Sequence, residues 1–240
     1  NAQSKIYGGL SYSDIFTDYG PFNTYLRDAT GAPVSNGNVN VGGQYVTVAQ
    51  SNFVTSSPLS GTNKRVFAGY EGVLAKDYKL KLDVSRVDRS DYFTTIGTGG
   101  TAVGGPGTQS DNPNVGTDAS AQLSFPVGDK HMLVSGLSIH RDTVNRSTFA
   151  LSNWRDVQTV TATNNGFTGE ATTTSAYVQD EMTVTDKLTV YAGVRADNWS
   201  TQGSYFQNTA PVKAVNYAER SQTAFSPKLS AVYKPAETVT

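Results

Sequence analysis

The chain has 240 residues, of which 37% are apolar and 16% are charged, and its formal net charge is -1. It contains no cysteine, which excludes disulfide bonds, thiol catalysis and cysteine-ligated zinc. The near-neutral charge gives no reason to expect a nucleic-acid partner. No run of about 18 apolar residues is present, so the sequence excludes a transmembrane helix but not a barrel of membrane-spanning strands.

The chain opens with "NAQSKIYGG", which has neither an initiating Met nor the pattern of a signal peptide. We therefore expect the sequence to be part of a longer protein. The first predicted strand is "KIYGGLSYSDIF", and a long polar segment, roughly residues 18–63, follows it.

Hairpins with short turns then recur along the chain. Their turns are "AKDY", "PVGDK" and "TDK", and a fourth is expected at "KPAE". Asp, Gly, Lys and Pro in these turns favour tight reversals. Because a long polar segment follows each hairpin, we expect about nine strands, with the short turns at one edge of the sheet and the long loops at the other. These later polar segments are residues 94–116, 147–173 and 201–222.

The predicted strands alternate apolar and polar residues, as in "LTVYAGVRAD", where every second residue from Leu188 to Ala196 is apolar. This period indicates a strand with one apolar face, and a soluble antiparallel sandwich would also show it. Strands of globular proteins usually have about 5–6 residues, whereas these alternations extend over roughly nine, enough to cross a bilayer when tilted. The pattern favours an all-β antiparallel transmembrane β-barrel, with short periplasmic turns and long extracellular loops.

Two residues do not fit this scheme. Asp180 is in phase with Ala176 and Val178 on the expected lipid face, although it lies near a turn, where a charge costs less than at mid-bilayer. Pro227 lies inside a predicted strand, where proline is unusual.

The sequence gives little support for catalysis or metal binding. The glycines of "GTGGTAVGGPG" precede no helix that would bind a phosphate, and "SDNPNVGTD" lacks the spacing of an EF-hand. His131 and His140 have no acidic or cysteine partners in the surrounding sequence, and no "GxSxG" motif occurs. We expect no enzyme activity, no cofactor and no metal site.

Capture of a ligand by the external loops and the upper lumen is the chemistry that remains. Aromatic side chains offer rigid contact area, and arginine donates charge-assisted hydrogen bonds to anionic groups such as chelate carboxylates. The alternative is that aromatic residues at the outer rim only anchor the barrel in the membrane interface. The candidates by position are Tyr92, Phe93, Arg146, Trp154, Arg155, Tyr205 and Phe206.

Three motifs in succession, "YVQDE" at residues 177–181, "TDKL" at 185–188 and "AGVR" at 192–195, resemble the barrel of TonB-dependent outer-membrane receptors. "FSPKL" and "YKP" resemble the next hairpin of that family. The resemblance covers about residues 174–240, and upstream it is only architectural.

The resemblance implies a receptor in the bacterial outer membrane that takes up a ferric siderophore, or cobalamin, with energy from TonB. The family is implied to have an N-terminal plug domain and a larger closed barrel. We therefore expect residues 1–240 to be part of one receptor barrel domain, with the plug and both barrel ends absent. A passive porin or other channel, and a soluble β-rich binding module, are the alternatives.

Overall fold

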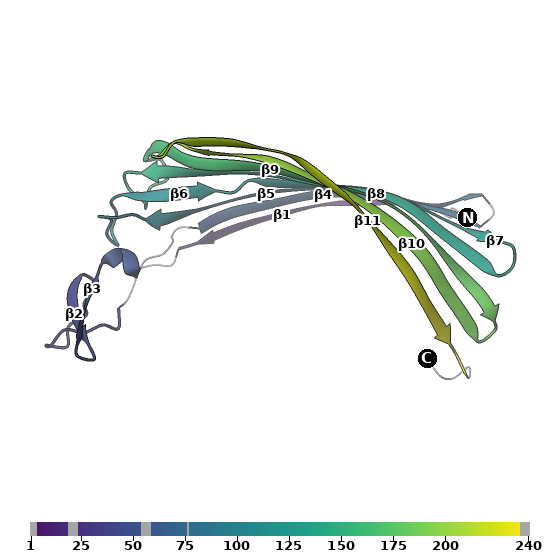
Figure 1. Ribbon diagram of the computed structural model, residues 1–240, viewed down its shortest axis with the longest axis horizontal. Helices are drawn as coiled ribbons and strands as arrows, with labels where there is room; N and C mark the ends of the chain where they lie inside the picture. Colours follow the sequence, from purple (N-terminus) through teal and green to yellow (C-terminus); the bar gives the residue numbers. More distant parts are fainter. Residues whose placement is uncertain (1–3, 19–23, 54–58, 76, 236–240) are drawn as a thin grey trace.

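The computed structural model describes residues 4–18, 24–53, 59–75 and 77–235. A single antiparallel sheet of nine strands contains most of these residues (Figure 1), which confirms the all-β prediction. Strands that are adjacent in the sheet follow one another in the chain. The exception is that β6 and β7 both lie between β5 and β8, where each pairs with a different part of these two long strands. The strands are β1 (Ser4–Thr17), β4 (Leu59–Ala75), β5 (Tyr78–Ile96), β6 (Gly107–Asp111), β7 (Asn114–Val127), β8 (His131–Leu151), β9 (Val160–Thr185), β10 (Leu188–Gln207) and β11 (Lys213–Tyr233).

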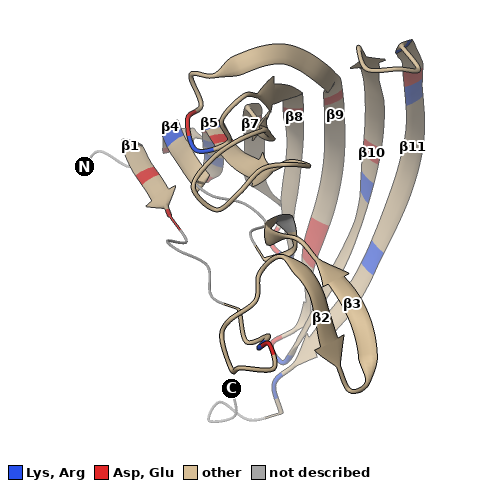
Figure 2. Ribbon diagram, turned by 90° about the vertical axis from the view of Figure 1, so that its left-hand side faces the viewer, with Lys and Arg blue, Asp and Glu red and all other residues tan. Residues whose placement is uncertain are grey.

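A small separate hairpin lies in the connection between β1 and β4. Its strands are β2 (Gly37–Val41) and β3 (Gln44–Val48), and a 3-10 turn, η1 (Gln50–Asn52), follows it. In Figures 1 and 2 the hairpin lies beneath the arch of the sheet, at the end that carries the longer connections. No helix within the described ranges is long and apolar enough to cross a membrane.

The short turns lie together at the opposite end of the sheet (Figure 1), as the sequence predicts. They connect β4 to β5, β7 to β8 and β9 to β10. Gly128 in the second turn has a φ of 62°, a left-handed conformation that glycine adopts without strain. The fourth expected turn follows β11, and its residues 236 and 237 lie outside the described residues.

Two of the segments expected to be long loops, residues 147–173 and 201–222, are instead mostly strand, and residues 94–116 are strand over about half of their length. Only residues 97–106, 152–159 and 208–212 connect β5 to β6, β8 to β9 and β10 to β11. β9 has 26 residues, far more than the roughly 9–11 that cross a bilayer. Beyond the membrane both faces of a strand contact water, so Thr, Ser and Asn occupy both faces and the alternation that marks a strand in the sequence disappears.

The register places most of the alternating apolar positions on one face, because directly opposed residues of antiparallel strands share a face. One such row is Leu82, Ala121, Leu137, Ala176, Ala196 and Phe225. The adjacent row, on the other face, is Lys81, Gln122, Gly136, Tyr177, Arg195 and Ser226. The predicted alternation therefore produces a continuous apolar face and a continuous polar face.

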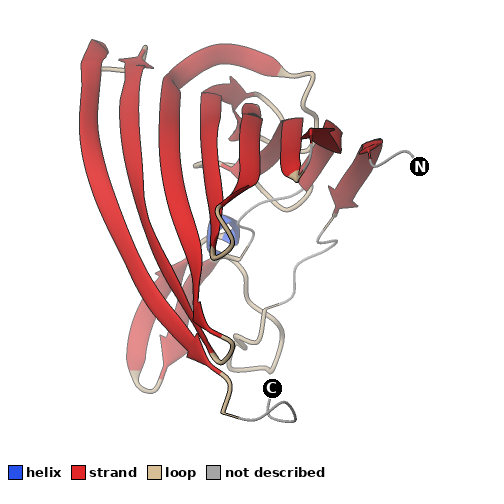
Figure 3. Cartoon of the chain, turned by 90° about the vertical axis from the view of Figure 1, so that its right-hand side faces the viewer, coloured by secondary structure: helices blue, strands red, loops and turns tan. Residues whose placement is uncertain are grey.

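The polar face is the concave one. The sheet is strongly curved (Figures 2 and 3), and side chains converge on a concave face and diverge on a convex one. On β9, Ser175 of the polar face is 2% exposed, whereas Val178 of the apolar face is 43% exposed. Leu137 on the apolar face of β8 is 64% exposed. An apolar convex surface of this extent is suited to lipid rather than to water.

Asp180 lies on the convex apolar face, opposite Leu133 and Ala192, and the structure shows why it is tolerated there. Its Oδ2 lies 2.6 Å from Nδ1 of His131 on β8, so the two groups form a polar pair close to the short turns. The expectation that His131 has no acidic partner is therefore wrong, because that partner comes from the neighbouring strand. Pro227 lies within β11 opposite Val194, and the strand continues on both sides of it.

Candidate ligand-binding surface on the concave face

Polar side chains on the concave face contact one another from strand to strand. The Tyr7 hydroxyl on β1 donates to Asp83 on β5, and the Tyr177 hydroxyl donates to Oε1 of Gln122 at 2.8 Å. These contacts keep the polar groups of the face hydrogen-bonded, as a wet barrel lumen permits. Further contacts of this kind join Lys5 to Glu71 at 3.0 Å, Lys228 to Gln179 at 3.2 Å and Arg195 to Ser175 at 2.8 Å.

His140 lies between two carboxylates just beyond the apolar band. Its Nδ1 is 2.6 Å from Oδ1 of Asp118, and its Nε2 is 2.7 Å from Oδ2 of Asp142. The hydrogen bond with Asp118, and next that with Asp142, raise the pKa of His140 above its ordinary value. The expectation that His140 has no acidic partner is therefore also wrong. Within the described part of the chain, no group of three or more His, Cys, Asp or Glu side chains is placed to hold a metal ion.

Arg146, Phe167 and Tyr205 form one cross-strand row on the concave face, near the end with the longer connections. The Arg146 guanidinium carbon lies 6.0 Å from the centre of the Phe167 ring, and its Nη2 is 3.5 Å from Oγ of Ser110. Phe93 on β5 is opposite Ser110, so it shares this face. We call Phe93, Arg146, Phe167 and Tyr205 the mouth row. It combines one cation with three aromatic rings.

Two of the sequence-derived candidates face the other way. Tyr92 and Phe206 neighbour Phe93 and Tyr205 in their strands, so they point to the convex side. The Phe206 ring covers Gly166, where an added Cβ would lie 2.7 Å from the ring. Phe206 is ten residues along β10 from Ala196, or about 33 Å along the strand. At a strand tilt near 45° this is a height of roughly 23 Å above the row of Ala196.

Trp154 belongs to a small packed cluster between two of the connections. It is 0% exposed, and its Nε1 donates to the carbonyl of Thr101 at 2.8 Å. An added Cβ at Gly107 would lie 2.4 Å from Cβ of Trp154 and 2.4 Å from the carbonyl oxygen of Thr95, so only glycine fits beneath the indole. Trp154 therefore holds residues 152–159 against residues 97–106 and is not exposed to a ligand.

Arg155 remains exposed at the surface of this cluster. Its Nε donates to the carbonyl of Ala102 at 2.7 Å, and its guanidinium lies 4.8 Å from the Trp154 ring. The amide of Ala102 in turn donates to Oε1 of Gln50 at 2.9 Å. Three connections at this end of the sheet are therefore joined into one unit.

Of the candidates, the structure brings Phe93, Arg146 and Tyr205 to one surface and places the other four elsewhere. Sequence reasoning missed Phe167, because it lies in a segment without alternation that was expected to be a loop. The only available signal was its aromatic side chain within a polar segment.

Long tilted strands, a convex apolar face and a concave polar face define the wall of a transmembrane β-barrel. The chain belongs to the TonB-dependent receptor family: the family model described as "TonB dependent receptor-like, beta-barrel" matches residues 3–240. The match extends the resemblance seen at residues 174–240 to almost the whole chain. TonB-dependent receptors are transporters and not enzymes. No curated protein matches the chain.

Three solved structures with a similar fold are named as an uptake receptor, a transporter and an import receptor. The ferric yersiniabactin uptake receptor FyuA from Yersinia pestis matches 99% of this chain at 14% identity and a TM-score of 0.63. The ferric citrate transporter FecA matches 98% at 12% identity and a TM-score of 0.66. The ferric-catecholate import receptor Fiu from E. coli K12 matches 98% at 14% identity and a TM-score of 0.60. The chain spans about a third of each of these proteins, 33%, 32% and 39% respectively.

Proposed function

We propose that this chain forms part of a bacterial outer-membrane receptor that takes up a ferric siderophore or a similar scarce chelate with energy from TonB. The observation that carries the proposal is the mouth row, in a chain that belongs to the TonB-dependent receptor family. The similar structures named for ferric yersiniabactin, ferric citrate and ferric-catecholate uptake support it. Cobalamin is the second ligand class to test.

The mouth row supplies the chemistry that such a chelate needs. Arg146 donates charge-assisted hydrogen bonds to an anionic group of the chelate, while Phe93, Phe167 and Tyr205 offer flat apolar area for its ring or hydrocarbon parts. Arg155 adds a second exposed guanidinium from the packed cluster around Trp154. Trp154 fixes that cluster, and Tyr92 and Phe206 support the row from the convex side.

The proposal includes the place of this chain in a longer protein. Residues 1–240 form an interior part of one receptor barrel domain, and the plug domain, the TonB-contacting segment and both barrel ends lie elsewhere in the full-length protein. The coverage of about a third of each similar structure supports this division.

Equilibrium binding to the full-length receptor in detergent tests the proposal. A panel of ferric catecholate, hydroxamate and citrate chelates and cobalamin is titrated, with Arg146→Ala as the variant and Arg89→Gln as a control on the same face of β5. We expect saturable binding of one member and at least tenfold weaker binding to Arg146→Ala only, since a hydrogen bond to a charged group contributes about 1.5–3 kcal/mol. Binding of no member would favour a passive porin.

A further inference from the structure

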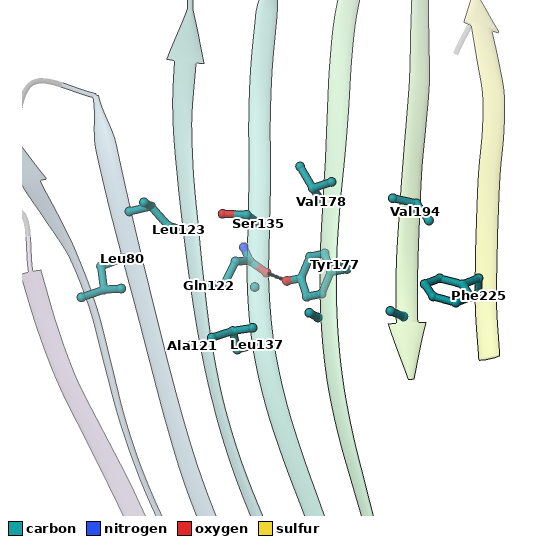
Figure 4. Close-up of a pocket in the computed structure, with 13 residues that line it drawn as sticks. Leu80, Ala121, Gln122, Leu123, Ser135, Leu137, Tyr177, Val178, Val194 and Phe225 are labelled. Atoms are coloured by element: carbon teal, nitrogen blue, oxygen red, sulfur yellow. Dashed lines mark hydrogen bonds between the residues drawn. The ribbon is translucent and has the colours of Figure 1, made fainter. Parts of the chain in front are cut away.

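A pocket opens on the concave face beside the mouth row, between β1, β4 and β5. It is separate from the apolar hollow of the convex face, where Figure 4 shows Leu137, Val178 and Phe225 on the side that meets lipid. Leu59 in the wall of the concave pocket is opposite Phe93 of the mouth row, so the pocket and the row adjoin. The pocket has a volume of about 210 Å³, below the roughly 300–1,000 Å³ of a site for a whole small molecule. It therefore suits one arm of a larger ligand.

The register of three strands forms this pocket. Ile15 on β1 is opposite Gly61 on β4, and Gly61 is opposite Asp91 on β5, so the three residues share one row. An added Cβ at Gly61 would lie 3.2 Å from Cβ of Asp91, so the glycine leaves space between its two neighbours. Ile15 is 59% exposed although it lies on the polar face. Together with Leu59 it offers apolar surface to the hydrocarbon part of a ligand.

Asp91 supplies the pocket with a carboxylate that can accept further hydrogen bonds. Its side chain is 24% exposed, whereas that of Arg89 is 60% exposed, so the carboxylate is the more enclosed of the two charges. Nε of Arg89 is 3.7 Å from Oδ1 of Asp91, and Nδ2 of Asn112 is 3.4 Å from Oδ2. Both distances are longer than those of charge-assisted hydrogen bonds, which are about 2.7–2.9 Å. Because a carboxylate has about four acceptor sites, Asp91 has capacity for a cationic donor.

Two further oxygen acceptors line the pocket. The Ser13 hydroxyl and the Asn63 side-chain carbonyl come from β1 and β4, in the row of Arg89. An ammonium group has three N–H donors and no acceptor, so it can donate to Asp91, Ser13 and Asn63 together. An anionic arm would instead face the carboxylate of Asp91. A short alkyl chain that ends in an ammonium therefore fits both the walls of the pocket and its charge.

The carboxylate lies close to the cation of the mouth row. Tyr92, Asp111 and Ser147 form one row across β5, β6 and β8, and Asp91 and Arg146 each precede a member of this row by one residue. β5 and β8 run in the same direction, since both are antiparallel to β7. Asp91 and Arg146 are therefore two strand spacings apart, or about 10 Å. One ligand can reach both charges at once.

We propose that this pocket is a second subsite of the mouth and binds the cationic aminoalkyl arm of a chelate whose anionic group binds Arg146. The methylene groups of the arm contact Ile15 and Leu59, and its ammonium donates to Asp91. The cargo is then a zwitterionic chelate, with an anionic iron-binding part and a primary amine on a side arm. This inference rests on the proposed function, because it names the class of chelate that the mouth accepts.

Chelate binding to the full-length receptor in detergent tests the subsite. Ferric catecholate, hydroxamate and citrate chelates are each prepared without an arm, with a primary aminoalkyl arm, and with the same arm N-acetylated, which removes its charge. Each form is titrated into the wild type, Asp91→Asn and Arg89→Gln. Arg89→Gln is the matched control, because it removes the neighbouring charge and leaves the carboxylate in place. A second variant, Gly61→Val, fills the space beside Asp91 and keeps both charges.

We expect the wild type to bind the amine form of one chelate about tenfold or more tightly than the acetylated form, since acetylation removes a charge-assisted contact. Asp91→Asn and Gly61→Val should lose this preference, whereas Arg89→Gln should keep it. All three variants should bind the arm-free form as the wild type does, which shows that they are folded.

Two kinds of result would contradict the subsite and leave the proposed function standing. One is equal binding of the amine and acetylated forms by the wild type. The other is a preference for the amine that survives in Asp91→Asn or disappears in Arg89→Gln. Binding of no chelate in any form would overturn both the subsite and the uptake of a ferric chelate.

Discussion

Placing an arginine at Leu137 tests the assignment of the two faces most sharply. Leu137 lies near the middle of the apolar band on β8, opposite Ala121 and Ala176, and is 64% exposed on the convex face. Arginine at the midplane of a lipid-facing strand costs about 2–4 kcal/mol, and the loss of the leucine side chain from lipid adds roughly 2 kcal/mol. We therefore expect Leu137→Arg to lower the free energy of unfolding by roughly 4–6 kcal/mol.

The neighbouring residue gives the matched control. Ser138 lies on the concave face between Ser120 and Ser175, in a row that also contains Asp83 and Asp197. Ser138 is half-buried, but an arginine there has small neighbours and two carboxylates within its row, so Ser138→Arg should cost about 1 kcal/mol, well below the cost of Leu137→Arg. Urea unfolding of the full-length receptor in phospholipid vesicles, followed by tryptophan fluorescence, measures both. Equal destabilisation by the two variants would refute the assignment of the faces.

Three further predictions concern the part of the sheet above the apolar band. Gly107→Ala should displace the indole of Trp154 and speed proteolytic cleavage within residues 152–159 several-fold, and an unchanged cleavage rate would show that the cluster has room to adjust. The pKa of His140 is raised in the folded protein, so its pairing with the carboxylates stabilises the fold fully below the ordinary pKa of about 6.5 and loses this effect as the pH rises through the raised value. The difference in unfolding midpoint between wild type and His140→Gln should therefore shrink between pH 6 and pH 9, and a constant difference would contradict the pairing. Arg146→Ala should weaken chelate binding at least tenfold, and retention of wild-type affinity would remove Arg146 from the site.

The membrane-spanning part of the fold could be predicted from the sequence because lipid imposes a strict period. Each outward position from Leu188 to Ala196 must be apolar, while Arg195 and Asp197 on the other face contact water and polar groups. The short turns are similarly constrained, since only a few residue types reverse the chain tightly. These two constraints were sufficient to predict the faces, the turns and the antiparallel order.

The parts that could not be predicted depend on contacts between strands. Phe167 joins Arg146 only through the register of β8 and β9, and His140 meets Asp118 only through that of β7 and β8. Above the membrane both faces of a strand are wet, so no alternation indicated that β9 and β10 extend so far. Trp154 is a candidate for the ligand surface because of its position in an expected external loop, whereas the glycine-rich connection of residues 97–106 packs around it.

Energy-dependent uptake by the full-length receptor can be measured in cells. Cells that express the full-length receptor are given the chelate that it binds, loaded with radioactive iron, with and without a functional TonB. We expect saturable uptake that is lost without TonB and greatly reduced in Arg146→Ala cells. Uptake that rises linearly with concentration and is the same without TonB would contradict it and identify a passive channel.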